Sequence, residues 1–590
     1  MFKFIQDMFS KQSELRKIII IVSIIWFLCS VYLIVTHWDI VLNLNFNDND
    51  DFMRFYQYRE WIKNGNWYLE PMPRFNPDGV LVMHWSRLAD IPLAILACFL
   101  SLFFDLSIAF AISNTLIPLI YLFIFLLVIS FITYLLFGFE TAKIAMLIPL
   151  ISPLSSRFLP GALDHHNLQF IFLALFILFS PLVMRNRSMK HDFICSLCMI
   201  LSLWVGLENI YSFVFILFLL TLYGYLSYFP FLFFCRSVCF ISVVIIPIFL
   251  ILNRPFSEFF EERYDVLSFP LFICFISALI FCLGLSIFKC FSLYNRLFIY
   301  ISMGILVLLP IVILYPDLLK GGYANYPERL KFLWLDNVSE AISIFGYMRK
   351  DVSNISYFFA VFMSFISLFF FRKGDVKYRV LYVAFLVNFI LAFFWQVRMF
   401  STALVCCIPL QAYTCFILRD KIKFAIGKSL VLILSFPSLI LFVFIILFVN
   451  NNEFSTKYDG LTPFSVISLL NKHEITERNI LAPVDLGAPI LAGTDNTIIS
   501  APYHRNIQGN LDVFDFFLFS DNKSAKEILE KYSIDYVLLD GGFFDYFSKN
   551  YSDNSMLIKL FKNENIPAYL EYIGSNGFIK LYKYKGDKNE

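Results

Sequence analysis

The chain has 590 residues, of which 59% are hydrophobic and only 16% are charged. Because globular proteins carry about a quarter charged residues, this composition excludes an ordinary soluble protein and indicates long segments that face lipid. The formal net charge of +2 argues against a nucleic-acid-binding protein. All twelve cysteines precede residue 416, so their distribution does not predict a disulfide framework.

Apolar segments of about 20 residues recur along the chain and predict a polytopic α-helical membrane protein with about thirteen transmembrane helices. The first segment, 18–36, follows a group of lysines and arginines, so the positive-inside rule places the N-terminus in the cytoplasm. A small-residue cleavage site does not follow it, which predicts a retained anchor. The other spans are expected at 108–136, 141–157, 164–184, 192–206, 207–228, 237–252, 266–288, 296–315, 355–371, 380–396, 399–418 and 429–450.

This topology places two long polar loops, 37–107 and 316–354, on the outer side of the inner (plasma) membrane. The apolar segment 88–104 is short and ends beside Asp105, and it is predicted to be an interfacial helix because the later basic clusters then all fall in the cytoplasm. With an odd number of spans, the C-terminal segment is periplasmic. The chain is thus predicted to divide into a transmembrane domain, 1–450, and a periplasmic domain, 451–590.

The C-terminal segment 451–590 changes in character. Glycine and proline return, and short β-rich runs at 479–484, 497–500 and 536–539 flank a helical pattern at 524–532. About 140 residues are enough to form a separate hydrophobic core. The segment is predicted to be a small extracytoplasmic α/β domain.

An acidic run in the first outer loop, Asn47-Asp48-Asn49-Asp50-Asp51, is a candidate metal site. Carboxylates this close repel one another unless a cation neutralises them, and Mg²⁺ or Mn²⁺ prefers oxygen ligands. The alternative is a solvated, asparagine-rich turn.

A second candidate is the segment 156–167, which reads Ser-Arg-Phe-Leu-Pro-Gly-Ala-Leu-Asp-His-His-Asn. Its proline and glycine break the helix, and Asp164 and His166, two residues apart, can project to the same side of an extended chain. A carboxylate and an imidazole suit a divalent transition ion. The alternative is that Asp164 caps the following helix.

Three further polar positions lie near the outer membrane face. Glu340 stands in the sequence Asn-Val-Ser-Glu of the second outer loop, and Arg398 follows Gln396 and Val397 at a span boundary. Arg398 can pair with a lipid phosphate or extend its charged end to the interface. Glu208 is a carboxylate within an apolar run and therefore a functional candidate, or it lies near a helix end.

Taken together and in this order, these residues resemble the catalytic subunit of oligosaccharyltransferases, which are membrane enzymes of the GT-C glycosyltransferase superfamily. Asp50 is similar to the family's first-loop aspartate, and Ser156-Arg157, Gly161 and Asp164-His165-His166 keep the spacing of its second-loop motif. The sequence 337–340 is similar to a Ser-Val-Ser-Glu type motif, and 397–399 is similar to the family's Val-Arg-Leu-Met. The family's plan of about thirteen spans and a C-terminal outer domain covers most of the chain.

The chain departs from this family at two places. His166 stands where the family has a second carboxylate. The family's Trp-Trp-Asp-Tyr-Gly, which reads the acceptor, falls at 483–487, where Asp485 and Gly487 remain and both tryptophans are absent. The usual asparagine acceptor is therefore not assumed. The segments 85–90 and 501–506 also resemble a group of bacterial inner-membrane proteins that are distantly related to these transferases.

The resemblance implies an inverting, metal-dependent glycosyltransferase that takes a sugar or oligosaccharide from a polyprenyl-phosphate-type lipid donor. It implies a divalent ion, Mn²⁺ or Mg²⁺, and an acceptor that is a protein, a lipid or a polysaccharide. The alternatives are a multi-span transporter or lipid-carrier flippase, and a scaffold protein. The implied roles are metal binding by Asp50, Asp164 and His166, catalysis by Asp50, Asp51, Asp164 and Glu340, donor phosphate binding by Arg398, and acceptor binding by Asp485.

Overall fold

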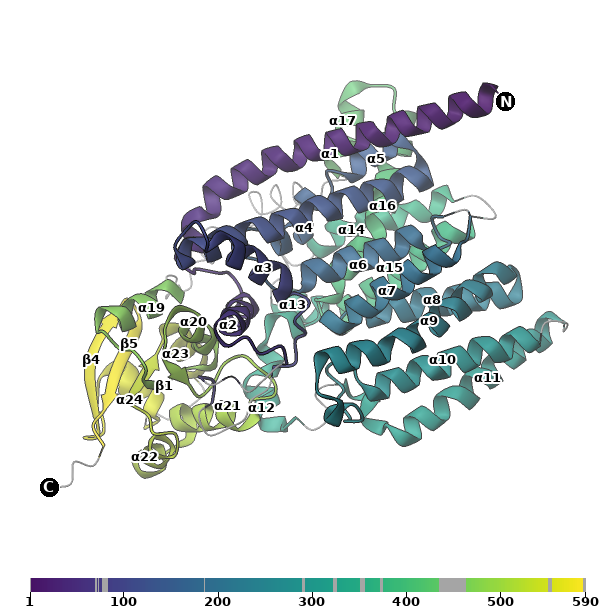
Figure 1. The fold of residues 1–590 in the computed structure, drawn as a ribbon. Helices are drawn as coiled ribbons and strands as arrows, with labels where there is room; N and C mark the ends of the chain where they lie inside the picture. Colours follow the sequence, from purple (N-terminus) through teal and green to yellow (C-terminus); the bar gives the residue numbers. More distant parts are fainter. Residues whose placement is uncertain are drawn as a thin grey trace.

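The structure is a computed structural model that describes residues 2–68, 72, 74–76, 83–184, 186–288, 292–321, 326–350, 356–371, 375–434, 463–549 and 554–586. A bundle of long helices forms most of the molecule, and a smaller domain with a five-stranded sheet lies at one end of the bundle (Figure 1). The N-terminus of the first helix lies at the opposite end of the bundle (Figure 1).

Apolar side chains fill the bundle. A helix satisfies its own backbone hydrogen bonds, so long apolar helices can cross a lipid bilayer. Seven helices of the described part are long and apolar enough to cross a membrane. They are α1 (Phe2–Leu42), α4 (Leu106–Phe137), α9 (Phe229–Asn253), α10 (Phe269–Ile287), α11 (Leu293–Leu314), α15 (Val376–Phe394) and α16 (Met399–Lys421). The shorter helices of the bundle are α5 (Phe139–Ala145), α6 (His166–Phe179), α7 (Met189–Val205), α8 (Ile210–Leu226), α14 (Ser356–Ile366) and α17 (Ala425–Leu434).

The multi-span helical architecture agrees with the expectation, and the count of thirteen spans is not confirmed. The expected span 141–157 is interrupted: α5 ends at Ala145, and 3-10 helices follow at Pro149–Ile151 and Pro153–Phe158. Proline begins each of these 3-10 helices, and its missing N–H cannot continue an α-helical ladder. Most of the expected span 429–450 lies outside the described residues.

The first polar loop is largely helical. Helix α2 (Asn49–Asn64) begins at the acidic run, where Asp48 is the N-cap and accepts a hydrogen bond from the backbone N–H of Asp50 at 3.2 Å. Helix α3 (Asp90–Leu100) is too short to span a bilayer, in line with the interfacial helix expected at 88–104. In the second polar loop lie α12 (Glu328–Leu333) and α13 (Ile344–Lys350).

The C-terminal domain holds a sheet of order β2-β1-β3-β5-β4. Strand β1 (Asn479–Leu481) pairs in parallel with β2 (Thr497–Ile498) and β3 (Tyr536–Leu539), and the antiparallel hairpin β4 (Leu570–Asn576) and β5 (Ile579–Tyr584) completes it. The three expected β-rich runs form β1, β2 and β3, and the expected helix forms α22 (Asn522–Lys531). The remaining helices are α19 (Pro463–Lys472), α20 (Val484–Gly493), α21 (Ile507–Phe514), α23 (Gly541–Phe547) and α24 (Met556–Lys562).

Two arginines of the first loop hold the C-terminal domain against α2. Arg59 donates to the backbone oxygens of Leu491 and Ala492 at 2.9 and 2.6 Å, at the C-terminal end of α20. Arg74 donates to the backbone oxygen of Thr494 at 2.6 Å, and Phe75 forms a parallel β-bridge to Ile498 of β2. A cation at a helix C-terminus satisfies carbonyls that lack partners within the helix. Helix α2 is thereby fixed relative to the sheet.

Candidate active site and metal centre

The candidate site lies where the loop before α6 meets the start of α2. The loop turns at Gly161, whose φ of +87° is a left-handed conformation that favours glycine. A Cβ at this position would also lie 3.0 Å from the ring of Phe46. The backbone N–H of Gly161 donates to the oxygen of Asn114 on α4 at 3.0 Å, so the turn is anchored to the bundle. The chain then presents Asp164, His165 and His166 in succession.

Asp51 fixes this loop to α2. One oxygen of its buried carboxylate accepts hydrogen bonds from the backbone N–H groups of Leu163 and Asp164, at 2.7 and 2.8 Å. Burial raises the pKa of Asp51 well above its ordinary value, and the charges of Asp48 and Asp164 raise it further. These contacts position the loop, and the catalytic role that the sequence suggested for Asp51 stays a prediction.

Asp164 lies at the centre of the cluster, and 5% of it is exposed. Its Oδ1 lies 2.6 Å from Nδ1 of His165, and its Oδ2 lies 3.2 Å from Nε2 of His166. Burial opposes ionisation, but the two imidazoles outweigh it and hold the pKa of Asp164 well below its ordinary value. Asp164 is therefore an anion, and its buried Oδ2 makes an ion pair with His166 but, among the described residues, no hydrogen bond of good geometry.

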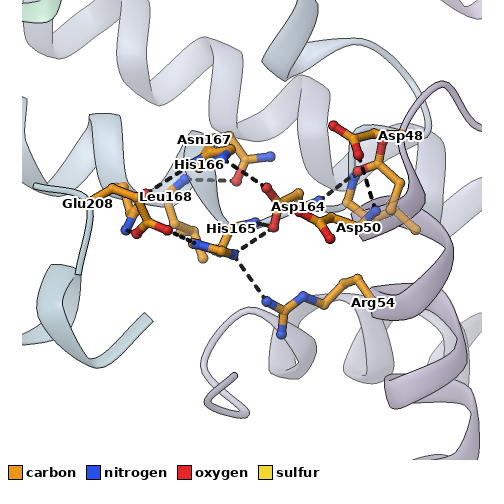
Figure 2. Close-up of polar contacts among 12 residues, drawn as sticks. Asp48, Asp50, Arg54, Asp164, His165, His166, Asn167, Leu168 and Glu208 are labelled. Carbon is orange, nitrogen blue, oxygen red and sulfur yellow. Dashed lines mark hydrogen bonds and ion pairs between the residues drawn. The ribbon is translucent and has the colours of Figure 1, made fainter. Parts of the chain in front are cut away.

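Asp50 faces the same centre from the first turn of α2 (Figure 2). Burial raises the pKa of Asp50 well above its ordinary value, and the charges of Asp48, Asp164 and Glu340 raise it further. Like charges this close cannot all ionise without a counter-charge. The arrangement therefore favours a bound cation.

Arg157 and Glu340 close another side of the cluster. The guanidinium of Arg157 forms an ion pair with Glu340 and a second with Asp48, the latter at 3.2 Å. Oε2 of Glu340 lies 3.7 Å from Nε2 of His166. Burial opposes the ionisation of Glu340, but the hydrogen bond and charge of His166, with Arg157 and Arg398, hold its pKa below the ordinary value.

Arg398, at the start of α16, is joined to the segment that carries Glu340. The backbone N–H of Val397 donates to the oxygen of Ile342 at 2.9 Å. The positive charge of Arg398 acts on both Glu208 and Glu340 and is among the causes that lower their pKa values. Arg398 thus belongs to this end of the bundle, next to the acidic cluster.

His165 connects the centre to Glu208, as Figure 2 shows. Its Nε2 lies 3.4 Å from Oε1 of Glu208, and its Nδ1 lies 3.4 Å from Nη2 of Arg54. Burial opposes protonation, but the charges of Asp164 and Glu208 raise the pKa of His165 to about 9. A Cβ at Gly206 would lie 2.4 Å from Glu208 and 2.6 Å from His165, so the chain approaches the cluster closely there.

Arg54 also belongs to a second buried group around Asp90. Nη1 of Arg54 lies 3.0 Å from Oδ1 of Asp90, and Arg87 lies 3.2 Å from Oδ2. Gln57 donates to the same Oδ2 at 2.6 Å. The guanidinium of Arg54 also lies 4.4 Å from the ring centre of Trp85. The group fixes α2 against α3 beside the candidate site.

Six of the seven site residues expected from the sequence gather at this end of the bundle: Asp50, Asp51, Asp164, His166, Glu340 and Arg398. Asp485 is different. It lies in the first turn of α20, and no hydrogen bond or ion pair among the described residues joins it to the cluster. The sequence named Asp48 and His165 within the two candidate segments without giving either a role of its own, and it missed Arg54. The partners of Arg54 are Asp90 and His165, which are 36 and 111 residues away, so spacing did not reveal it.

The residues present fit a divalent ion. Asp164, His165 and His166 each offer one ligand atom, and these atoms lie within 4.8 Å of one another. Oδ2 of Asp164 is buried and faces Nε2 of His166 at 3.2 Å, and Asp50 adds a further carboxylate. Carboxylate oxygens with an imidazole nitrogen are ligands of Mn²⁺ and Zn²⁺.

No family model matches the chain, and no curated protein does. Solved structures do match it. The oligosaccharyltransferase AglB from Archaeoglobus fulgidus, in complex with an inhibitory peptide and a dolichol-phosphate, has a TM-score of 0.62 at 14% identity, with 95% of this chain and 74% of that chain covered. An oligosaccharyltransferase from Archaeoglobus fulgidus in complex with Zn and sulfate has a TM-score of 0.56 at 14% identity, with 94% of this chain and 72% of that chain covered.

The chain has the fold of an oligosaccharyltransferase. The fold that the motifs indicated is thereby confirmed. ArnT from Cupriavidus metallidurans also matches, with a TM-score of 0.38 at 12% identity over 95% of this chain and 98% of that chain.

Proposed function

We propose that this protein is a membrane glycosyltransferase that transfers a sugar or oligosaccharide from a polyprenyl-phosphate-type lipid to an acceptor. The observation that carries the proposal is the convergence of Asp50, Asp164, His166, Glu340 and Arg398 at one end of a bundle with the oligosaccharyltransferase fold. The dolichol-phosphate complex of the archaeal enzyme supports a lipid-linked donor.

In this proposal Asp50, Asp164 and His166 hold a divalent ion. When bound, the ion neutralises the charge that develops on the phosphate leaving group. A structure of an archaeal oligosaccharyltransferase in complex with Zn and sulfate supports the binding of a transition ion by a protein of this fold. His166 in place of a second carboxylate lowers the site's negative charge and favours Mn²⁺ or Zn²⁺ over Mg²⁺.

The other residues of the cluster have roles that follow from their contacts. Arg398 offers a guanidinium that binds phosphate oxygens in a two-pronged arrangement. Arg157 holds Glu340 beside His166, so the segment that carries Glu340 is placed over the centre. An acceptor held by Asp50 or Glu340 would attack the anomeric carbon from the side opposite the leaving phosphate, with inversion.

The positions of the basic residues support a periplasmic site. Tyr134 near the end of α4 donates to Glu14 of α1 at 3.0 Å, and Tyr378 near the start of α15 donates to the oxygen of Leu136 at 3.2 Å. These contacts show which helix ends lie together, at the end of the bundle away from the cluster. The basic residues Lys143 and Lys421 lie at this same end. The positive-inside rule assigns that end to the cytoplasm.

The transporter alternative places ionisable groups within the bundle, near the bilayer centre. Glu208, which was the main candidate for such a group, lies in the turn between α7 and α8 and contacts His165. It therefore belongs to the cluster at the end of the bundle, which favours the transferase.

The test is the release of sugar from polyprenyl-phosphate-linked and polyprenyl-diphosphate-linked donors by the purified full-length chain. Water serves as the acceptor, and Mn²⁺ is added back after chelation. We expect ion-dependent release that Asp164→Asn abolishes. His473→Ala, a histidine of the C-terminal domain outside the cluster, is the matched control. Equal release by Asp50→Asn, Asp164→Asn and the unaltered chain would refute the proposal.

A further inference from the structure

A second group of histidines and a carboxylate lies outside the proposed active site. His84 comes from the first loop, Asp265 from the segment between α9 and α10, and His504 from the C-terminal domain before α21. Each offers one ligand atom, and these atoms lie within 4.8 Å of one another. Two of the three residues fall in or beside the segments 85–90 and 501–506, which the proposed reaction leaves without a role.

The donor set is one that transition ions prefer. Two imidazoles and one carboxylate ligate Zn²⁺ and related ions, and water completes the coordination. Nε2 of His504 lies 2.9 Å from Oδ2 of Asp265. In a tetrahedral site, two ligand atoms that are each about 2.1 Å from the ion are about 3.4 Å apart, so His504 and Asp265 need to separate by about 0.5 Å to admit one. The ligand atoms lie within 4.8 Å of one another, so His84 completes the set by a small movement of its ring.

Neighbouring side chains orient the ligands. The hydroxyl oxygen of Tyr503 lies 2.6 Å from the backbone nitrogen of His84 and 2.7 Å from its Nδ1. When that oxygen accepts from both, Nε2 of His84 keeps a lone pair for an ion. Arg505 donates to both oxygens of Asp265, at 2.7 and 2.9 Å, and holds the carboxylate in place. Such supporting contacts are typical of metal ligands.

We propose that His84, Asp265 and His504 form a second divalent metal site, of the Zn²⁺ type, that fastens the C-terminal domain to two loops of the transmembrane domain. The side chains of Asp265 and His504 are 14% and 15% exposed, so an ion can reach them from water. The positive charge of Arg505 weakens the site relative to one without a neighbouring cation. The bound ion therefore exchanges with solution, and the occupancy of the site depends on the concentration of free ion.

The site also lies close to the proposed active site. The rings of His84 and Trp85 are 5.5 Å apart, and those of Trp85 and His165 are 6.0 Å apart. Trp85 lies against both Arg54 and His165. An ion that draws His84 toward His504 therefore also changes the surroundings of Trp85. Occupancy of the second site is coupled to the geometry of the first.

The test is Co²⁺ and Zn²⁺ binding by the full-length chain that carries both Asp50→Asn and Asp164→Asn. These two changes remove ligands of the first site, so a bound ion is assigned to the second site. We expect one bound ion, visible as Co²⁺ absorption bands, and an affinity that falls by more than about tenfold in His504→Ala. His504→Cys, which supplies another ligand, restores binding, whereas His473→Ala leaves it unchanged. Zn²⁺ also slows proteolysis between the two domains in the background variant but not after His504→Ala.

Two results would overturn the proposal. One is the absence of a bound ion in the background variant, which would make the group a hydrogen-bonded junction. The other is equal affinity with and without His504→Ala. If His504→Ala fails to fold, Asp265→Asn in the same background gives the same comparison, because its side chain keeps the size but loses the charge.

Discussion

Asp90 and Asp164 are both buried aspartates at the same end of the bundle, and Arg54 lies between them, yet their surroundings differ. Both oxygens of Asp90 have cationic partners, and Gln57 adds a hydrogen bond. The oxygens of Asp164 face two imidazoles, at 2.6 and 3.2 Å, and other carboxylates lie beside it. A buried charge that arginines neutralise supports the fold, whereas one that faces titratable imidazoles, which are themselves metal ligands, is suited to a ligand.

The largest expected effect is on transfer by Asp164→Asn. Loss of the central charge removes a metal ligand, and we expect turnover to fall by at least about 10²-fold. We expect the melting temperature to fall less than in Asp90→Asn, because His165 and His166 can lose their protons whereas arginines cannot. Donor turnover and thermal melting of the same preparation check both parts. A melting temperature that falls as far as that of Asp90→Asn would show that Asp164 supports the fold instead.

Asp90→Asn should lower stability more than Asp164→Asn does. The change leaves Arg54 and Arg87 buried without a counter-charge, so we expect the free energy of unfolding to fall by about 3–5 kcal/mol. Thermal melting in detergent measures the loss. The control is Glu571→Gln, which removes a half-exposed partner of Lys585 and should cost at most about 1 kcal/mol. Equal losses in the two variants would contradict the comparison.

The pH dependence of stability tests the pairing of His165. Its pKa is about 9 in the folded protein and 6.5 as an ordinary value, so its contribution is complete below pH 6.5 and disappears as the pH rises through 9. We expect the ion-free protein to lose up to about 3 kcal/mol of stability over this range relative to His165→Asn. Melting temperatures measured against pH check this. Parallel curves for the two proteins would mean that His165 is not protonated.

The smallest expected effect concerns the ion pair of Arg157 and Glu340, whose side chains are 26% and 23% exposed. Partial exposure screens the pair, so a double-mutant cycle with Arg157→Gln and Glu340→Gln should give a coupling of about 1 kcal/mol in stability. Transfer should depend on Glu340 more strongly than this coupling implies. Unaltered turnover in Glu340→Gln would remove that residue from the site.

The sequence predicted the parts of this arrangement that local spacing controls. Pro160-Gly161 marked the turn. Asp164 and His166 do meet through Oδ2, but not on an extended chain as expected, because His165 is helical and His166 begins α6. Strand β3 was predicted with its observed bounds. In each case the signal lies within a few neighbouring residues.

The partners that are distant in sequence could not be predicted. Arg54 and His165 are 111 residues apart, and Arg157 and Glu340 are 183 residues apart, so helix packing alone brings them together. One feature was missed although its signal was present. Asn576-Gly577 separates two runs of alternating polarity, which is typical of a hairpin, and the structure has β4 and β5 there.

The position of a bound ion tests the central claim most directly. Crystals of the full-length chain soaked in Mn²⁺ and measured at the manganese absorption edge would locate it by anomalous scattering. The account predicts a peak about 2.0–2.3 Å from carboxylate oxygens of Asp50 and Asp164 and from Nε2 of His166, and no such peak in Asp164→Asn. A map without a peak at these residues, or a peak that persists in Asp164→Asn, would contradict it.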